Sequence, residues 1–200
     1  MDTSVFKDFV SRHAHGHLVG IGGVSMAPLA EVLKRSLGIN VSGSDIRESE
    51  TVDKLRSLGI KIAIGHDAKN IEGADFVVRT AAARDDNPEI AAARAAGIPV
   101  YERAEVWGFL MRGYKNSICV SGTHGKTTTT SMITHIFMQA GLDPTVMIGG
   151  TLPLLKASHR VGHGDTIIME SCEYYNSFLS FFPTVAVILN IEADHLDFFK

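Results

Sequence analysis

The chain has 200 residues, of which 45% are hydrophobic, and a formal net charge of −3 from 19 basic and 22 acidic side chains. This length suits one large or two small domains and allows burial of about 70% of the unfolded surface. No long basic run and no apolar run of about 18 residues occurs, so we expect neither nucleic-acid binding nor membrane insertion. Residues 1–12 alternate apolar and charged side chains, unlike a secretory signal, so the expected compartment is the cytoplasm.

Short β-rich runs alternate with helical runs along the chain. Strands are expected at residues 17–20, 39–42, 61–64, 76–79, 99–100, 117–120, 145–148, 166–170 and 185–189. Helices are expected at residues 26–37, 50–58, 88–96, 104–112 and 126–140. This alternation indicates an α/β fold, with helices on the faces of parallel sheets. Four glycines follow helical runs, where a left-handed residue commonly ends a helix: Gly38, Gly59, Gly97 and Gly141.

The first glycine-rich turn reads Gly20-Ile21-Gly22-Gly23-Val24-Ser25-Met26, between an expected strand and an expected helix. It resembles the dinucleotide fingerprint G-x-G-x-x-G, with Ser25 in place of the third glycine. Asp45 follows the second strand, at a position that suits a ribose or nucleoside contact. The pattern favours a diphosphate at a helix N-terminus, and the alternative is tight packing of strand against helix without a ligand.

The second glycine-rich turn reads Ser121-Gly122-Thr123-His124-Gly125-Lys126-Thr127-Thr128 and again joins a strand to a helix. Its backbone N–H groups and the helix dipole favour a phosphate. In a P-loop the lysine reaches the outer phosphates and the next hydroxyl binds Mg²⁺, so we assign these roles to Lys126 and Thr127. Two residues separate Gly122 from Gly125, whereas the general P-loop has four, and the alternative is a glycine turn with a solvated lysine.

Two later strands run into polar residues that suit a metal–phosphate site. Glu170 ends an apolar strand and is placed to hold Mg²⁺ as a Walker B acid does, with Glu173 as the alternative. The last strand runs into Asn190, Asp194 and His195, and His195 is a candidate for a second metal or for phosphate oxygens.

Five other histidines are better interpreted as structural or surface residues than as site residues. His13, His15 and His17 would share one face of a strand and suit a metal there, but we interpret them as a flexible lead-in, with His17 entering the first strand. His159 and His163 lie in the glycine-containing stretch 158–165, which reads as a surface hairpin.

These motifs together resemble the Mur ligase family, the ATP-dependent ligases of bacterial peptidoglycan synthesis. The resemblance spans residues 17–200 and includes both turns and the run Asn190-Ile191-Glu192-Ala193-Asp194-His195-Leu196-Asp197. The stretches 87–89 and 98–105 add support. The short glycine spacing of the second turn is the form that this family uses.

The resemblance implies a reaction, a set of ligands and a domain arrangement. ATP would phosphorylate the lactyl carboxylate of UDP-N-acetylmuramate, and L-alanine would then attack the acyl phosphate, with Mg²⁺ as the metal. Residues 1–112 would form a Rossmann-like UDP-sugar-binding domain, and residues 113–200 an incomplete P-loop ATP-binding domain. By itself the chain would therefore be inactive. Its family role would lie in building the cell wall, and thus in cell shape and division.

The resemblance also assigns roles to particular residues. The implied catalytic residues are Lys126, Glu170 and His195. The implied ATP-binding residues are Gly122, Thr123, His124, Gly125, Lys126, Thr127 and Thr128. The implied UDP-sugar-binding residues are Gly20, Ile21, Gly22, Gly23, Val24, Ser25, Met26, Asp45 and His124. The implied metal ligands are Thr127, Glu170 and His195.

The chain departs from the family pattern at three places, and two other functions stay open. Ser25 stands where the family often has glycine. Cys172 and Tyr175 replace acids, and the run 80–83 replaces a serine-rich loop, which puts details of substrate contact in doubt. One alternative is the family member that recycles murein peptides by adding a tripeptide, which the short segment 178–183 disfavours. The other is an NAD- or nucleotide-binding module without ligase activity. The sequence does not indicate the oligomeric state.

Overall fold

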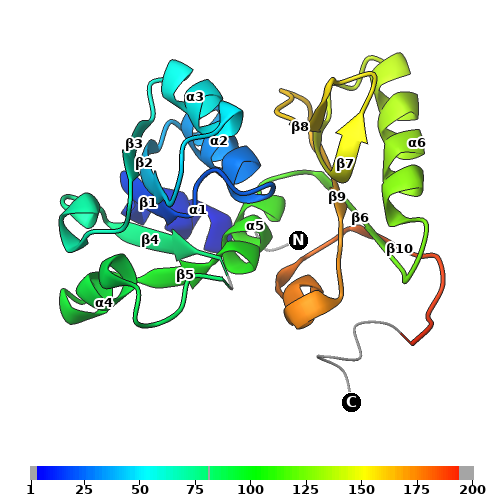
Figure 1. The fold of residues 1–200 in the computed structure, drawn as a ribbon. Coiled ribbons are helices and arrows are strands. Elements are labelled where there is room, and N and C mark those ends of the chain that lie inside the picture. Colours follow the sequence, from blue (N-terminus) through cyan, green and yellow to red (C-terminus); the bar gives the residue numbers. More distant parts are fainter. Residues whose placement is uncertain (1–3, 81, 194–200) are drawn as a thin grey trace. The chain divides into compact units, whose positions relative to one another are not determined.

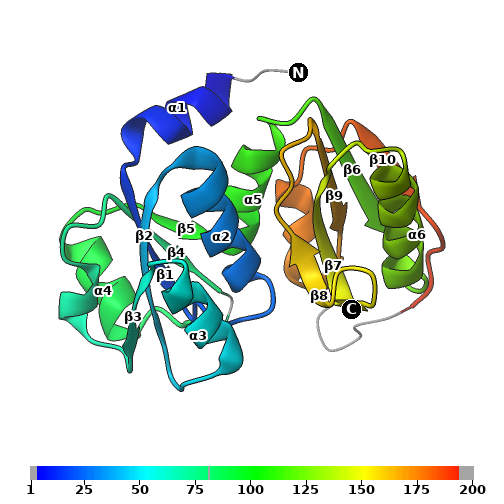
Figure 2. The same ribbon diagram turned by 90° about the horizontal axis from the view of Figure 1, so that it is seen from above.

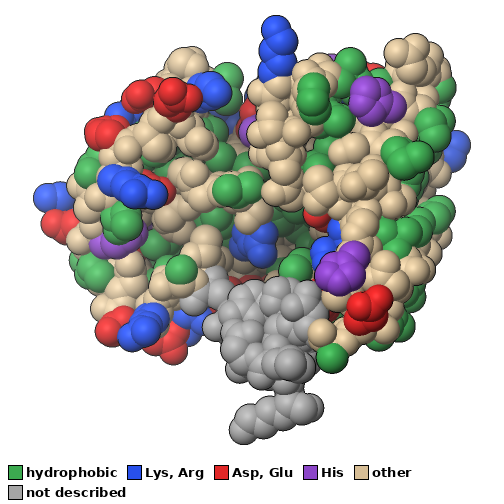
Figure 3. Space-filling view, turned by 45° about the vertical axis from the view of Figure 1, so that its right-hand side comes forward, with side chains coloured by type: hydrophobic (Ala, Val, Ile, Leu, Met, Phe, Trp, Pro, Cys, Tyr) green, Lys and Arg blue, Asp and Glu red, His purple; other side chains and the backbone are tan. Residues whose placement is uncertain are grey.

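The computed structural model describes residues 4–80 and 82–193, which divide into two compact units (Figure 1). One unit comprises Ser4–Val106 and the other begins at Trp107. Each contains one five-stranded sheet with helices, so the expected α/β fold class is confirmed. In the described part of the chain, no helix is long and apolar enough to cross a membrane. Acidic and basic side chains are interspersed over the face drawn in Figure 3, outside its grey region.

The sheet of the first unit is fully parallel and has the order β3-β2-β1-β4-β5. Its strands are β1 (His15–Val19), β2 (Asn40–Asp45), β3 (Lys61–Ile64), β4 (Phe76–Arg79) and β5 (Val100–Glu102). The helices are α1 (Ser4–Arg12), α2 (Met26–Leu37), α3 (Glu50–Ser57), α4 (Pro88–Ala95) and the 3₁₀ helix η1 (Ala68–Ile71). The helix α5 (Arg103–Met111) begins in this unit and continues past its end at Val106. The strand order reverses direction between β1 and β4, which is the place where doubly wound sheets bind ligands.

Apolar residues at strand and helix spacing build the core of this unit. α2 contacts β2 and α3, whereas α4 contacts η1, β4 and β5. α2 buries Leu29 and Leu33, and α4 buries Ile90 and Ala93 against Val77.

Helices end where the sequence predicted, because the four glycines expected there all have positive φ: Gly38 at 67°, Gly59 at 76°, Gly97 at 70° and Gly141 at 70°.

The second unit has a mixed sheet with the order β10-β6-β9-β7-β8. Its elements are β6 (Asn116–Ser121), α6 (Lys126–Gln139), β7 (Thr145–Leu152), β8 (Ala157–Arg160), β9 (Thr166–Glu170), the 3₁₀ helix η2 (Tyr174–Ser180) and β10 (Val185–Ile188). α6 lies against β6, β7 and β9 and covers an apolar cluster that includes Ile148 and Ile168 (Figure 2). We expected parallel strands, but β8 pairs antiparallel with β7 and makes this sheet mixed. The hairpin expected within residues 158–165 is therefore wrong: this stretch contains the end of β8 and the loop before β9, and the hairpin turn lies at residues 153–156.

The N-terminal region also differs from our interpretation of it as a lead-in. Residues 4–12 form α1, and β1 already begins at His15. Phe9 of α1 is only 4% exposed, and its ring centroid lies 5.3 Å from that of Phe76. His15 and His17 do share a face, but each has a ring nitrogen 2.9 Å from Ser42 Oγ, and among the described residues no cluster suits a metal ion.

Candidate functional site

The lysine-containing turn joins the end of β6 to the start of α6. Gly122 has a φ of 140° and Gly125 a φ of 85°, conformations that other residues rarely adopt. Gly125 is the N-cap residue of α6, and among the described residues no side chain caps this helix end. The first N–H groups of a helix have no acceptor within the helix. The turn therefore offers donors and a helix dipole to an anion.

Thr127 and Glu170 meet beside this turn, although 43 residues separate them. β9 pairs in parallel with β6, with Glu170 opposite Val120, so the carboxylate ends its strand next to the turn. The Thr127 hydroxyl donates to Glu170 Oε2 at 3.2 Å, and Gly149 N donates to Glu170 Oε1 at 2.7 Å. A hydroxyl and a carboxylate are oxygen ligands of the kind that Mg²⁺ prefers, with waters and phosphates completing its octahedron.

Gly149 is a residue of this site that the sequence analysis missed. A Cβ atom at Gly149 would lie 2.7 Å from Glu170 Oε2, so a larger residue here would require the carboxylate to shift from this position. The signal in the sequence is the pair Gly149-Gly150 inside a strand, which often marks a close approach to another group.

Lys126 lies across the turn. Its ammonium group donates to the carbonyl oxygens of Gly122 and Thr123 and lies 3.5 Å from Glu173 Oε2. Its side chain is only 16% exposed. Glu173, which we considered as an alternative to Glu170, therefore contacts Lys126, whereas Glu170 contacts Thr127.

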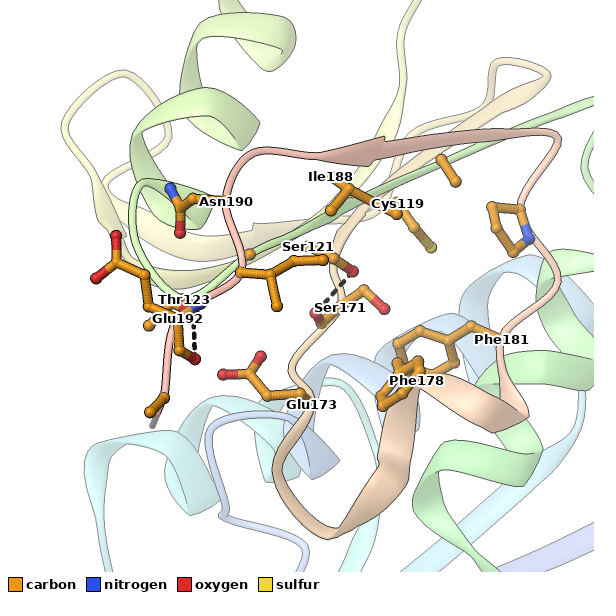
Figure 4. Close-up of a pocket in the computed structure, with 15 residues that line it drawn as sticks. Cys119, Ser121, Thr123, Ser171, Glu173, Phe178, Phe181, Ile188, Asn190 and Glu192 are labelled. Carbon is orange, nitrogen blue, oxygen red and sulfur yellow. Dashed lines mark hydrogen bonds between the residues drawn. The ribbon is translucent and has the colours of Figure 1, made fainter. Parts of the chain in front are cut away.

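A cavity of about 580 Å³ opens beside the turn (Figure 4). Its polar lining comes from the turn, from Ser171 and Glu173 after β9, and from Asn190 and Glu192 after β10. Phe178 and Phe181 form an apolar wall. Cys119 also lines the cavity, and burial raises the pKa of its thiol to about 12, so this thiol stays protonated at neutral pH.

The first glycine-rich turn joins β1 to α2. Gly20 N and Ile21 N donate to the carbonyl oxygen of Ser44 at 2.8 and 2.9 Å. Gly22 N donates to Asp45 Oδ2 at 2.8 Å, and Ile46 N donates to Asp45 Oδ1 at 2.8 Å. The Asp45 carboxylate thus ties the turn to the end of β2, and its contact to a nucleoside stays a prediction.

The side chains of this turn divide by exposure. Ile21 and Met26 are fully buried, whereas Val24 is 69% exposed. Ser25 is the N-cap of α2, and among the described residues no hydrogen bond from its side chain caps the helix. The Ser25 hydroxyl instead accepts a hydrogen bond from the Arg103 guanidinium. The sequence analysis did not name Arg103 as a site residue, yet it adds a positive charge where the first turn enters its helix.

A buried carboxylate, Glu89, supports the first turn from behind. Glu89 is 0% exposed and accepts hydrogen bonds from Ser44 Oγ and Asn70 Nδ2, both at 2.6 Å. His66 Nδ1 lies 2.9 Å from Glu89 Oε2. Burial raises the pKa of Glu89, but the interaction with His17 and the hydrogen bonds from Ser44 and Asn70 outweigh it and lower the pKa to about 2. The carboxylate is therefore ionised at neutral pH. It binds Ser44 at the end of β2, and the carbonyl oxygen of Ser44 in turn accepts from Gly20 N.

Two further predicted site residues at the turn are exposed, and a third lies outside the described residues. The His124 side chain is 72% exposed, with Nε2 3.9 Å from Glu192 Oε2. Thr128 is also exposed at the start of α6. His195 and its neighbour Asp194 lie outside the described residues, so the second-metal role of His195 stays a prediction.

The fold and the two turns define an α/β protein with a P-loop-type turn in one unit and a dinucleotide-type turn in the other. The chain belongs to the Mur ligase family. The family model "Mur ligase family, catalytic domain" matches residues 15–115, and the model "Mur ligase middle domain" matches residues 120–200.

Named relatives and solved structures agree with this membership. The chain is 50% identical over 194 residues to a UDP-N-acetylmuramate–L-alanine ligase of Clostridium botulinum and 54% identical over 191 residues to one of Lachnoclostridium phytofermentans. The alignments cover 96% and 95% of this chain, but only 42% and 40% of those relatives. The chain thus spans about two fifths of the length of the curated relatives that it matches.

Two crystal structures share the fold with a TM-score of 0.82. One is the UDP-N-acetylmuramate-alanine ligase MurC of Thermotoga maritima, which is 38% identical and matches over 92% of this chain and 43% of that chain. The other is the UDP-N-acetylmuramate:L-alanyl-gamma-D-glutamyl-meso-diaminopimelate ligase of Neisseria meningitides, which is 28% identical and matches over 94% and 64%.

Proposed function

We propose that a full-length protein carrying this chain joins L-alanine to UDP-N-acetylmuramate at the expense of ATP, in peptidoglycan synthesis. The observation that carries the proposal is the Thr127–Glu170 pair beside an uncapped helix N-terminus, in a chain about half identical to ligases of that name. The murein-peptide ligase is the second candidate. Its solved structure is 28% identical to this chain, whereas that of MurC is 38% identical, and this difference disfavours it.

The chemistry consists of two transfers. A lactyl carboxylate oxygen attacks the γ-phosphorus of ATP, and the bond to ADP breaks. The amine nitrogen of L-alanine then attacks the acyl carbon, phosphate leaves with the bonding electron pair, and the nitrogen loses a proton to form the amide. The main barrier is the approach of an anionic carboxylate to a triphosphate, so the protein must offset negative charge.

The described residues can supply this compensation. The N–H groups at the start of α6 would hold phosphate oxygens, and Lys126 would leave the carbonyls of Gly122 and Thr123 to contact the outer phosphates. Thr127 and Glu170 would hold Mg²⁺, which neutralises charge on the β- and γ-phosphates when bound. His195 would assist with a second metal. During phosphate transfer, Lys126 would therefore exchange the carbonyl oxygens of Gly122 and Thr123 for phosphate oxygens.

The first unit would bind the UDP part of the sugar nucleotide. The helix N-terminus at Ser25 would face the diphosphate, while Arg103 would add a positive charge. The N–H groups of Gly20, Ile21 and Gly22 already donate to Ser44 and Asp45 and would shape the turn. Asp45 is the proposed nucleoside contact, in addition to its bonds to Gly22 and Ile46.

The test compares acceptors and nucleotides. The full-length protein is assayed for phosphate release with ATP, Mg²⁺ and UDP-N-acetylmuramate, in the presence of either L-alanine or the murein tripeptide. We expect turnover with L-alanine, and turnover with the tripeptide alone would replace this proposal with the recycling reaction. Calorimetry on the 200-residue chain then compares UDP-N-acetylmuramate with NADH. Tighter binding of NADH would favour a dinucleotide-binding module.

A further inference from the structure

The segment that follows β10 runs alongside the lysine-containing turn. β10 pairs with β6 up to Ile188 opposite Ser121, and Leu189 N then donates to Ser121 O at 3.0 Å. A Cβ atom at Gly122 would lie 3.1 Å from Leu189 Cβ and 3.2 Å from the backbone of Asn190. The chain after β10 therefore packs against the turn closely enough to require glycine there.

Asn190 holds the backbone of the turn at two consecutive residues, Thr123 and His124. Its side-chain Oδ1 accepts from His124 N at 2.8 Å, and its Nδ2 donates to His124 O at 3.0 Å. Its own carbonyl oxygen accepts from Thr123 N at 3.2 Å. A primary amide side chain carries both an acceptor oxygen and a donor nitrogen, so it can bond to the N–H and the C=O group of one residue at the same time.

Thr123 and Glu192 form a second contact between the turn and the segment after β10. Glu192 N donates to Thr123 Oγ1 at 2.9 Å, and the same hydroxyl donates to Glu192 O at 3.2 Å. The N–H groups of Thr123 and His124 are thus bonded within the protein. The N–H groups that remain to meet a phosphate are those at Gly125 and in the first turn of α6, where helix geometry provides no acceptor.

We propose that Asn190 is a positioning residue for the phosphate-binding turn: it holds the Thr123–His124 backbone so that the α6 N-terminus and Lys126 face the ATP phosphates. This inference rests on the proposed function and adds a determinant of ATP affinity. A turn with two glycines in left-handed or extended-positive conformations is flexible by itself, so ATP would otherwise have to order it on binding. Fixing the turn in advance removes that cost from binding.

The placement of Asn190 argues for positioning over a general role in folding. Asn190 is only half-buried, and it follows an edge strand whose Val185 and Ile188 are 49% and 66% exposed. Its polar atoms are directed at the backbone of the turn and not at the apolar core. Removing its amide therefore changes the turn more than it changes the core.

The test uses the full-length protein with Asn190→Ala and Asn190→Asp. Asn190→Ala removes both side-chain bonds, whereas Asn190→Asp keeps the size and Oδ1 but sets a carboxylate oxygen against His124 O. For both variants we expect the KM for ATP to rise at least tenfold, while the KM values for UDP-N-acetylmuramate and L-alanine stay within twofold. Gln139→Ala is the matched control, because it also removes a primary amide and Gln139 is exposed at the end of α6 opposite the turn.

A direct readout on the turn accompanies the kinetics. In the wild-type chain we expect slow hydrogen exchange at the His124 amide, and at least tenfold faster exchange in Asn190→Ala, with β6 amides unchanged. An unchanged KM for ATP in both folded variants would overturn the positioning role. So would equal rises in all three KM values, or rapid exchange at His124 in the wild type. If the wild type shows no ATP-dependent turnover, the proposed function fails, and the exchange data still decide whether Asn190 orders the turn.

Discussion

The buried carboxylate of Glu89 gives the sharpest quantitative prediction for this chain. Glu89 is fully buried behind the first glycine-rich turn and has a pKa of about 2, against an ordinary value of 4.5. Its Oε1 accepts from Asn70, and its Oε2 accepts from Ser44. We consider the change Glu89→Gln, which keeps the shape of the side chain but replaces one oxygen by an NH₂ group.

The sign of the pH effect follows from the direction of the pKa change. Because the folded pKa of Glu89 lies below the unfolded value, its ionisation stabilises the protein above pH 4.5, and this contribution is lost as the pH falls towards 2. The difference between the two pKa values corresponds to about 3 kcal/mol. About 2 kcal/mol of it should be lost between pH 7 and pH 3. Glu89→Gln has no such contribution, and its misplaced donor should lower stability at pH 7 by about 2 to 4 kcal/mol.

The assay is urea unfolding at pH 7 and pH 3, followed by backbone amide NMR signals of β1 and β4, which lie in the same unit as Glu89. The wild type should lose about 2 kcal/mol more than Glu89→Gln on acidification. Glu72→Gln is the control, because Glu72 is an exposed carboxylate in the same unit and its loss should leave the difference intact. Parallel losses in the wild type and in Glu89→Gln would refute the reasoning.

Three further changes test the other parts of the molecule. Lys126→Ala in the full-length protein should lower kcat at least about a hundredfold, because the charge that offsets carboxylate and triphosphate is gone, and near-normal phosphate release would contradict this role. Glu170→Gln should raise the Mg²⁺ concentration needed for half-maximal rate about tenfold or more while Gly149 N keeps an oxygen acceptor, and an unchanged Mg²⁺ dependence would exclude Glu170 as a ligand. Gly43→Ala should lower stability by about 1 to 3 kcal/mol in urea unfolding, since the new Cβ would lie 2.7 Å from Leu18 O, and an unchanged midpoint would contradict the close packing of β2 on β1.

The elements that the sequence predicted best are those with local signals. The helix at Met26–Leu37 and the strands at Lys61–Ile64, Phe76–Arg79 and Thr166–Glu170 have the expected bounds. Residues 4–12 were missed as a helix because Phe9 is buried by Phe76, which is distant in the sequence. β8 was missed as a ladder strand because its partner β7 supplies the pairing.

The sequence by itself determined the α/β class and the two strand–glycine–helix turns. Each depends on an apolar run, on glycines that adopt positive φ and on a following helix, all within one short segment, so the necessary information is local. Only the tertiary structure decided that Glu170 and not Glu173 meets Thr127, that Gly149 admits the carboxylate, and that Asn190 holds the turn. These contacts join residues up to 66 positions apart, and strand order and register bring them together, which no local pattern specifies.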